Sequence, residues 1–84
     1  MNIKLYSKTN CPTCVKAKSL LSMKNLPYTE YHLWEKDNPP DGNYYTREMF
    51  FSLFPNARTV PQIVIDDVSI GSYEQLKEYL ESDT

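Results

Sequence analysis

The sequence predicts a small α/β fold in which helices flank a four-stranded mixed sheet. Its 84 residues suit one domain. Short apolar stretches typical of strands alternate with segments whose apolar residues recur at helical spacing, in the order β-α-β-α-β-β-α. No internal repeat or linker divides the chain, so we expect a single domain over residues 1–84.

The first half of the chain predicts a β-α-β unit. Residues 3–7 alternate apolar and polar side chains, as a short strand does. Pro12 suits the first turn of a helix, which we expect to end near Asn25. Residues 28–33 are rich in aromatic and β-favouring types, which indicates a second strand parallel to the first.

The middle of the chain predicts a loop and a second helix. Residues 34–43 are dense in turn-forming types and should form a loop. A helix is expected from about Tyr44 to Phe54. Its predicted apolar face consists of Met49, Phe50, Leu53 and Phe54.

The last third predicts a hairpin and a final helix. Residues 62–65 and 68–70 should pair around the turn between them. Ser72 and Gln75 match a capping box, which places the start of the last helix there.

Composition narrows the class of protein. The net charge of -2 and the pI of about 5.2 argue against general nucleic-acid binding. The sequence shows no signal peptide and no membrane span, so we expect a soluble cytoplasmic protein. In that reducing compartment two cysteines are more often reactive or metal-binding than structural.

The central motif is Cys11-Pro12-Thr13-Cys14, between a predicted strand and helix. In a β-α-β unit, a C-x-x-C motif indicates a thioredoxin-like fold with redox activity. The helix N-terminus stabilises a Cys11 thiolate, and Lys8 adds a positive charge nearby. We therefore expect Cys11 to attack disulfides and the more buried Cys14 to resolve the mixed disulfide.

Three other interpretations of the cysteines compete with this one. A structural disulfide is disfavoured because the chain shows no sign of export. Structural zinc needs about four ligands, and only His32 joins the two cysteines. Two unreactive core cysteines are disfavoured because Pro12 and the helix start argue against burial of Cys11.

Two weaker motifs follow. Val60-Pro61 either starts an edge strand or forms a cis turn opposite Cys11, leaving the Val60 backbone free to pair with an extended peptide. Residues 71–74 either bind a carboxylate at a helix N-terminus or simply begin the helix. The sequence leaves both choices open.

Taken together, these residues resemble the dithiol glutaredoxins, and the resemblance covers nearly the whole chain. The family pattern is an early lysine, C-P-x-C, T-V-P and an I-G-G-type turn. Here it is matched by Lys8, Cys11–Cys14, Thr59–Pro61 and Ile70-Gly71-Ser72.

The resemblance implies a glutathione-dependent thiol–disulfide oxidoreductase with glutathione as co-substrate, no bound cofactor and no metal. Lys8, with Arg47 or Arg58, would meet the glycine carboxylate, and Val60 would pair with the cysteinyl backbone. Tyr73 and Glu74 would meet the γ-glutamyl end. Thr13 and Pro61 complete the expected glutathione-binding set.

Three departures from the family pattern bear on substrate preference. Thr13 stands where many members have tyrosine, Ser72 replaces a glycine, and the 34–43 loop is longer than in compact bacterial members. The length and this loop resemble phage or viral glutaredoxins, which would place the protein in a host cytoplasm.

The expected partners are disulfide-containing proteins, and the expected state is a monomer. Two alternative functions stay open. One is a redoxin reduced by thioredoxin reductase that serves ribonucleotide reductase. The other is a dimeric, glutathione-assisted carrier of an iron–sulfur cluster or zinc.

Overall fold

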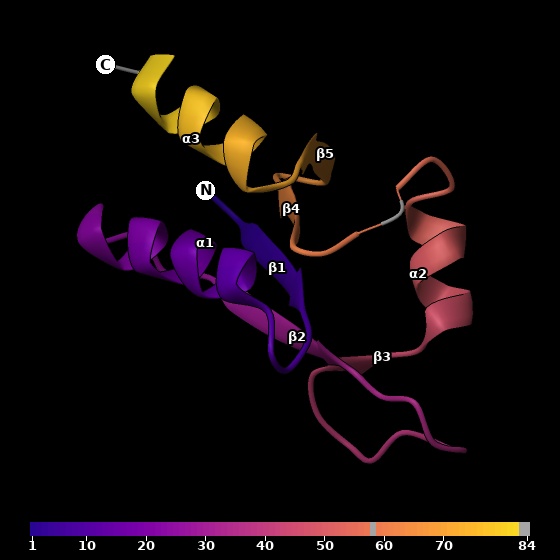
Figure 1. Ribbon diagram of the computed structural model, residues 1–84. Helices are drawn as coiled ribbons and strands as arrows, with labels where there is room; N and C mark the ends of the chain where they lie inside the picture. The colour runs from indigo at the N-terminus through magenta and orange to yellow at the C-terminus, as the bar shows by residue number, and fades with distance from the viewer. Residues whose placement is uncertain (58, 83–84) are drawn as a thin grey trace.

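The computed structural model describes residues 1–57 and 59–82 (Figure 1). Three helices and a five-stranded sheet follow one another as β1 Ile3–Ser7, α1 Pro12–Met23, β2 Thr29–Leu33, β3 Tyr44–Tyr45, α2 Arg47–Leu53, β4 Gln62–Ile65, β5 Val68–Gly71 and α3 Tyr73–Ser82. The predicted thioredoxin-like α/β architecture is confirmed. None of the helices in the described ranges is long and apolar enough to cross a membrane.

The sheet has the strand order β3-β2-β1-β4-β5, so β1 lies at its centre. β1 runs parallel to β2, as predicted for the β-α-β unit, and antiparallel to β4. β4 and β5 form the predicted hairpin. Asp66 and Asp67 both have positive φ, 50° and 67°, as the two central residues of a tight primed hairpin turn require.

The fifth strand corrects the sequence prediction, which started the second helix near Tyr44 and counted four strands. Tyr44 and Tyr45 instead pair in parallel with the end of β2, which suits the β propensity of tyrosine. The helix begins only at Arg47 because the Thr46 hydroxyl accepts a hydrogen bond from the Met49 N–H at 3.2 Å and caps it.

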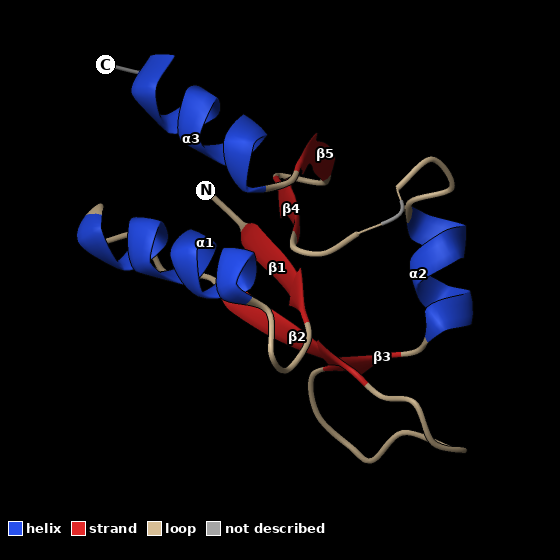
Figure 2. Cartoon of the chain, viewed as in Figure 1, coloured by secondary structure: helices blue, strands red, loops and turns tan. Residues whose placement is uncertain are grey.

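Helices cover both faces of the sheet (Figure 2). α1 and α3 lie together on one face, and α2 lies on the other. Side chains alternate along β1 accordingly: Leu5 packs in the cluster beneath α1 and α3, whereas Tyr6 packs with Phe50 and Phe54 of the α2 side. The central strand is therefore buried on both faces, and the loop that follows it leads directly to the two cysteines.

The apolar face predicted for α2 is only half right. Phe50 and Phe54 are buried, but Met49 and Leu53 are exposed, as is Phe51. Phe50 and the C-cap residue Phe54 are four positions apart and share the side of the helix that faces the sheet, whereas Met49 and Leu53 share a neighbouring side.

Candidate active site

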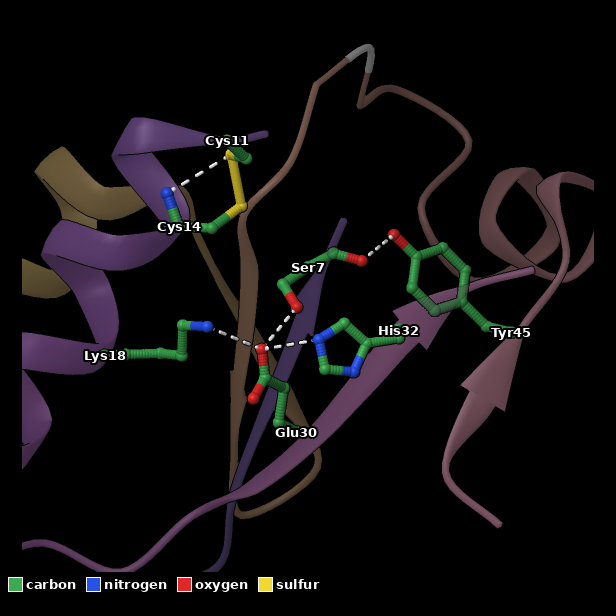
Figure 3. A network of polar contacts seen from close by, with 7 residues as sticks. All are labelled: Ser7, Cys11, Cys14, Lys18, Glu30, His32 and Tyr45. Atoms are coloured by element: carbon green, nitrogen blue, oxygen red, sulfur yellow. Dashed lines mark hydrogen bonds and ion pairs between the residues drawn. A yellow bond between two sulfur atoms is a disulfide. The ribbon is translucent and has the colours of Figure 1, made fainter. Parts of the chain in front are cut away.

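The two cysteines lie where β1 gives way to α1. Cys11 is the N-cap of α1, and Cys14 lies in its first turn. Their Cα atoms are 5.2 Å apart and their sulfurs form a disulfide, as Figure 3 shows. The spacing of three residues thus brings both sulfurs to the same helix end, as the motif predicts.

The two sulfurs differ in their surroundings. The Cys11 sulfur accepts a hydrogen bond from the Cys14 N–H at 3.2 Å. A backbone N–H at a helix N-terminus stabilises negative charge on an acceptor, so the reduced Cys11 thiolate gains from this contact. Cys14 is 1% exposed and Cys11 is 9% exposed, which confirms that Cys14 is the more buried.

One expectation about Cys11 is wrong for this disulfide form. Pro12 and the helix start argued against burial of Cys11, yet only 9% of the residue is exposed. Two features close over it: the bond to Cys14, which turns its sulfur toward the helix, and the approach of the Val60 turn. The sequence could not show this approach, because Val60 is distant along the chain.

The Val60-Pro61 turn lies against Cys11. The peptide bond is cis, which is one of the two alternatives that the sequence left open, and Pro61 is fully buried. The Val60 carbonyl oxygen lies 3.7 Å from the Cys11 sulfur. Among the described residues the Val60 N–H has no hydrogen-bond partner, so the backbone of this residue is available to an incoming peptide.

A cavity of about 130 Å³ adjoins this turn. Lys8, Arg47 and Val60 all line it. Lys8 is exposed and has no polar partner among the described residues. Arg47, in contrast, donates a 2.6 Å hydrogen bond to the Glu35 carboxylate, an ion pair that lies at the same cavity.

Three further residues predicted for the site, Thr13, Tyr73 and Glu74, do not line this cavity. Tyr73 begins α3 and packs partly against the larger core cluster, and Glu74 is exposed beside it. Thr13 is exposed in the first turn of α1. Arg58 lies outside the described residues. Within the described ranges no three His, Cys, Asp or Glu side chains are grouped closely enough to hold a metal ion.

A polar network lies on the sheet side of the cysteines (Figure 3). Three donors from different elements converge on one oxygen of Glu30. They are the Ser7 hydroxyl at 2.6 Å, the Lys18 ammonium at 3.0 Å and the His32 imidazole at 3.2 Å. Lys18 stands one helical turn after Cys14, so the network anchors the cysteine-bearing face of α1 to β1 and β2.

The network sets the protonation of its carboxylate. Burial alone would raise the pKa of Glu30, but the hydrogen bonds from Ser7 and Lys18 and the charges of His32 and Lys18 outweigh it and lower the pKa. Glu30 is therefore ionised at neutral pH. Sequence reasoning missed this network because its members come from three separate elements.

Tyr45 in β3 holds the C-terminal end of β1 through a hydrogen bond to Ser7. Its hydroxyl donates a 2.8 Å hydrogen bond to the Ser7 carbonyl, and its side chain is buried. Burial, with a smaller contribution from the charge of Glu35, raises the pKa of Tyr45 to about 12. Ser7 is thus held through both its hydroxyl and its carbonyl, directly before the loop that carries Lys8.

Taken together, the fold and this cysteine pair define a thiol–disulfide oxidoreductase of the thioredoxin-like class. A thiol at a helix N-terminus, with a second thiol one turn away and a peptide-accepting turn beside it, is suited to forming and resolving mixed disulfides.

Comparison with known proteins identifies the family. Residues 3–70 match the sequence profile described as Glutaredoxin. Glutaredoxin 3 of Escherichia coli K12 is 39% identical over 75 residues, which cover 89% of this chain and 81% of that protein. A probable glutaredoxin of Synechocystis is 34% identical over 74 residues, and this chain spans only 62% of its length. The chain belongs to the glutaredoxin family.

Solved structures agree with the fold. The crystal structure of Glutaredoxin 1 from Francisella tularensis, complexed with cacodylate, has a TM-score of 0.73 and 27% identity, covering 98% of this chain and 94% of that one. The solution structure of reduced Escherichia coli glutaredoxin has a TM-score of 0.66 and covers 99% and 96% of the two chains. Its 23% identity supports the fold alone.

Proposed function

We propose that the protein is a glutathione-dependent reductase of protein disulfides and of glutathione mixed disulfides. Cys11 is the nucleophile and Cys14 is the resolving thiol. Lys8 binds the glycine carboxylate of glutathione, and Val60 pairs with its cysteinyl backbone. Arg47 joins Lys8 only when Glu35 releases it, since the two side chains are paired in the free protein.

The observation that carries the proposal is the position of Val60. Its carbonyl oxygen is 3.7 Å from the Cys11 sulfur, and its N–H lacks a partner among the described residues. A short extended peptide can pair with these backbone groups as an added strand. The unpaired ammonium of Lys8 borders the same cavity, where it favours a carboxylate at the end of that peptide.

The chemistry is a series of thiol–disulfide exchanges. The Cys11 thiolate attacks one sulfur of a substrate disulfide, a new S–S bond forms, and the other sulfur leaves as a thiolate. The Cys14 thiolate then attacks the Cys11 sulfur and releases the second substrate thiolate. If a glutathione thiolate makes this attack instead, glutathione stays joined to Cys11, and a second glutathione thiolate attacks the sulfur of that bound glutathione, releases the Cys11 thiolate and forms glutathione disulfide. Attack by Cys14 leaves the Cys11–Cys14 disulfide, and two glutathione thiols reduce that bond and leave as glutathione disulfide.

We also propose the oligomeric state, the cellular compartment and the substrates of the protein. The protein works as a monomer in the cytoplasm, or in the host cytoplasm if its source is viral. Its substrates are disulfide-containing proteins, with ribonucleotide reductase as one candidate. The support is the reducing environment that a recycled dithiol needs and the family resemblance.

A coupled assay tests the electron source. NADPH consumption is followed with glutathione and glutathione reductase, and separately with thioredoxin reductase alone. We expect activity only in the first arm. Activity in the second arm alone would identify a redoxin served by thioredoxin reductase, and a coloured, dimeric anaerobic preparation would identify an iron–sulfur carrier.

A matched pair of lysine variants tests the glutathione contact. Lys8→Gln removes the charge at the cavity and should raise the KM for a glutathione mixed disulfide by about three- to tenfold. Lys24→Gln removes an exposed lysine at the far end of α1 and should leave the KM unchanged. Equal effects of the two variants would mean that Lys8 acts only through net charge.

A further inference from the structure

Phe51 is an aromatic residue of α2 that is exposed and not buried against the sheet. Of the aromatic side chains, all of which lie in the described part of the chain, only Phe51 is exposed, at 55%. A single exposed apolar residue is ordinary on a protein surface. This one, however, borders the cavity beside Val60, next to the reactive cysteine.

The cavity has a mixed lining, with Lys8, Glu35 and Arg47 as its charged side chains. Buried Tyr45 and Phe50, with Leu33, supply apolar lining, and Phe51 and Val60 add further apolar surface. Its volume of about 130 Å³ is close to that of the cavity of ~150 Å³ that holds one benzene molecule. The space therefore matches one bulky apolar side chain.

The location relates this side chain to the reaction. Val60 is both a wall of the cavity and the neighbour of the Cys11 sulfur, at 3.7 Å. Successive residues of an extended peptide are about 3.3–3.6 Å apart. A peptide whose cysteine is at Cys11 can thus bring a side chain one or two residues away into the cavity.

We propose that this cavity, with Phe51 as its exposed wall, selects protein disulfides that carry a bulky aliphatic or aromatic residue within two positions of the reactive cysteine. The inference rests on the proposed attack by Cys11 but not on glutathione as the reductant. Of the cations at this cavity, Arg47 is paired with Glu35 and Lys8 is unpaired, so the test must separate apolar contact from recognition of charge by Lys8.

The test uses reduced protein in single turnovers, so that Cys11 and Cys14 supply both electrons and no glutathione is present. Each peptide carries its cysteine as a mixed disulfide with a chromophoric thiol. Cys11 attacks the peptide sulfur and releases that thiol, and Cys14 then displaces the peptide and closes the disulfide. Three peptides differ only beside the cysteine, with leucine, serine or aspartate.

Wild-type protein should react with the leucine peptide about five- to tenfold faster than with the serine peptide. Phe51→Ala should remove most of that advantage and leave the serine peptide within about twofold of wild type, which also shows that the variant is folded. Met49→Ala, on the opposite flank of α2 and 47% exposed, is the matched control and should preserve the preference.

Three results would overturn the proposal. One is a wild-type protein that does not distinguish leucine from serine, and another is a Phe51→Ala variant that slows both peptides equally. The third is a preference for aspartate that disappears in Lys8→Gln, which would show that the cavity recognises charge. Failure of the glutathione-coupled assay alone would leave this preference unaffected, so the two claims fail separately.

Discussion

The sulfur of Cys11 lies 3.7 Å from the carbonyl oxygen of Val60, although 49 positions separate the two residues in the chain. In the disulfide form the Cys11 sulfur has no proton to donate, so it lies near the Val60 oxygen without a hydrogen bond between them. In the reduced form the Cys11 thiol can donate to that oxygen. A peptide paired with Val60 therefore has its own sulfur held against the nucleophile.

The Glu30 network predicts an acid-dependent loss of stability. The pKa of Glu30 in the folded protein lies below the value of 4.5 expected in the unfolded chain. Its ionised carboxylate therefore contributes fully above about pH 4.5, and the contribution is lost as the pH falls through the lower folded value. Glu30→Gln should lower the free energy of unfolding by about 1 kcal/mol at about pH 7 and by much less at about pH 2.

Urea unfolding of both proteins at the two pH values measures this difference. Glu78→Gln, which removes an exposed carboxylate of α3, is the control and should change little at either pH. A Glu30→Gln effect that is the same at both pH values would contradict the assignment of Glu30 as the charged centre of the network.

Tyr45 should stabilise the end of β1 through its hydroxyl. Tyr45→Phe removes the 2.8 Å hydrogen bond to Ser7 and leaves a buried carbonyl without that donor, at a cost of about 1–2 kcal/mol. Chemical denaturation measures the cost. Tyr44→Phe is the control, because the Tyr44 hydroxyl has no hydrogen-bond partner among the described residues, and the account would be wrong if both variants lost the same stability.

The raised pKa of Tyr45 predicts that the folded protein loses stability at high pH. The pKa of Tyr45 is about 12 in the folded protein and about 10 in the unfolded chain. Its contribution is complete below about pH 10 and is lost as the pH rises through about 12. Stability measured across this range should fall more steeply for wild type than for Tyr45→Phe, and parallel curves would contradict the pKa assignment.

Thr46 should determine where α2 begins. Thr46→Ala removes the oxygen that accepts from the Met49 N–H, and this should cost about 1 kcal/mol of unfolding free energy. Ser52→Ala, at an exposed position inside the same helix, should be neutral or slightly stabilising. If thermal melts show no difference between the two variants, the capping contact is not what begins the helix.

The sequence predicted best those features that depend on neighbouring residues. β1 and β4 have the predicted bounds, and the first turn of α1 follows directly from the C-P-T-C motif. The cis bond before Pro61 was one of two alternatives that the sequence offered, because cis peptides are largely confined to proline. Each of these signals lies within a few residues of the structure it predicts.

Features that depend on distant partners were missed. β3 is only two residues long and exists because Tyr44 and Tyr45 meet the end of β2. Glu30 receives its three donors from β1, α1 and β2, which no local pattern links. A single carboxylate on a strand rich in aromatic residues was the available signal, but it does not identify the partners.

The most direct test of the central claim is to trap the intermediate. Cys11→Ser and Cys14→Ser are each reduced, mixed with glutathione disulfide and analysed by mass spectrometry of the intact protein. The account predicts a stable glutathione adduct on Cys11 in Cys14→Ser, and little or no adduct in Cys11→Ser, whose remaining thiol is 1% exposed in the wild-type fold. Equal adduct formation in both variants, or an adduct only in Cys11→Ser, would contradict the assignment of Cys11 as the nucleophile.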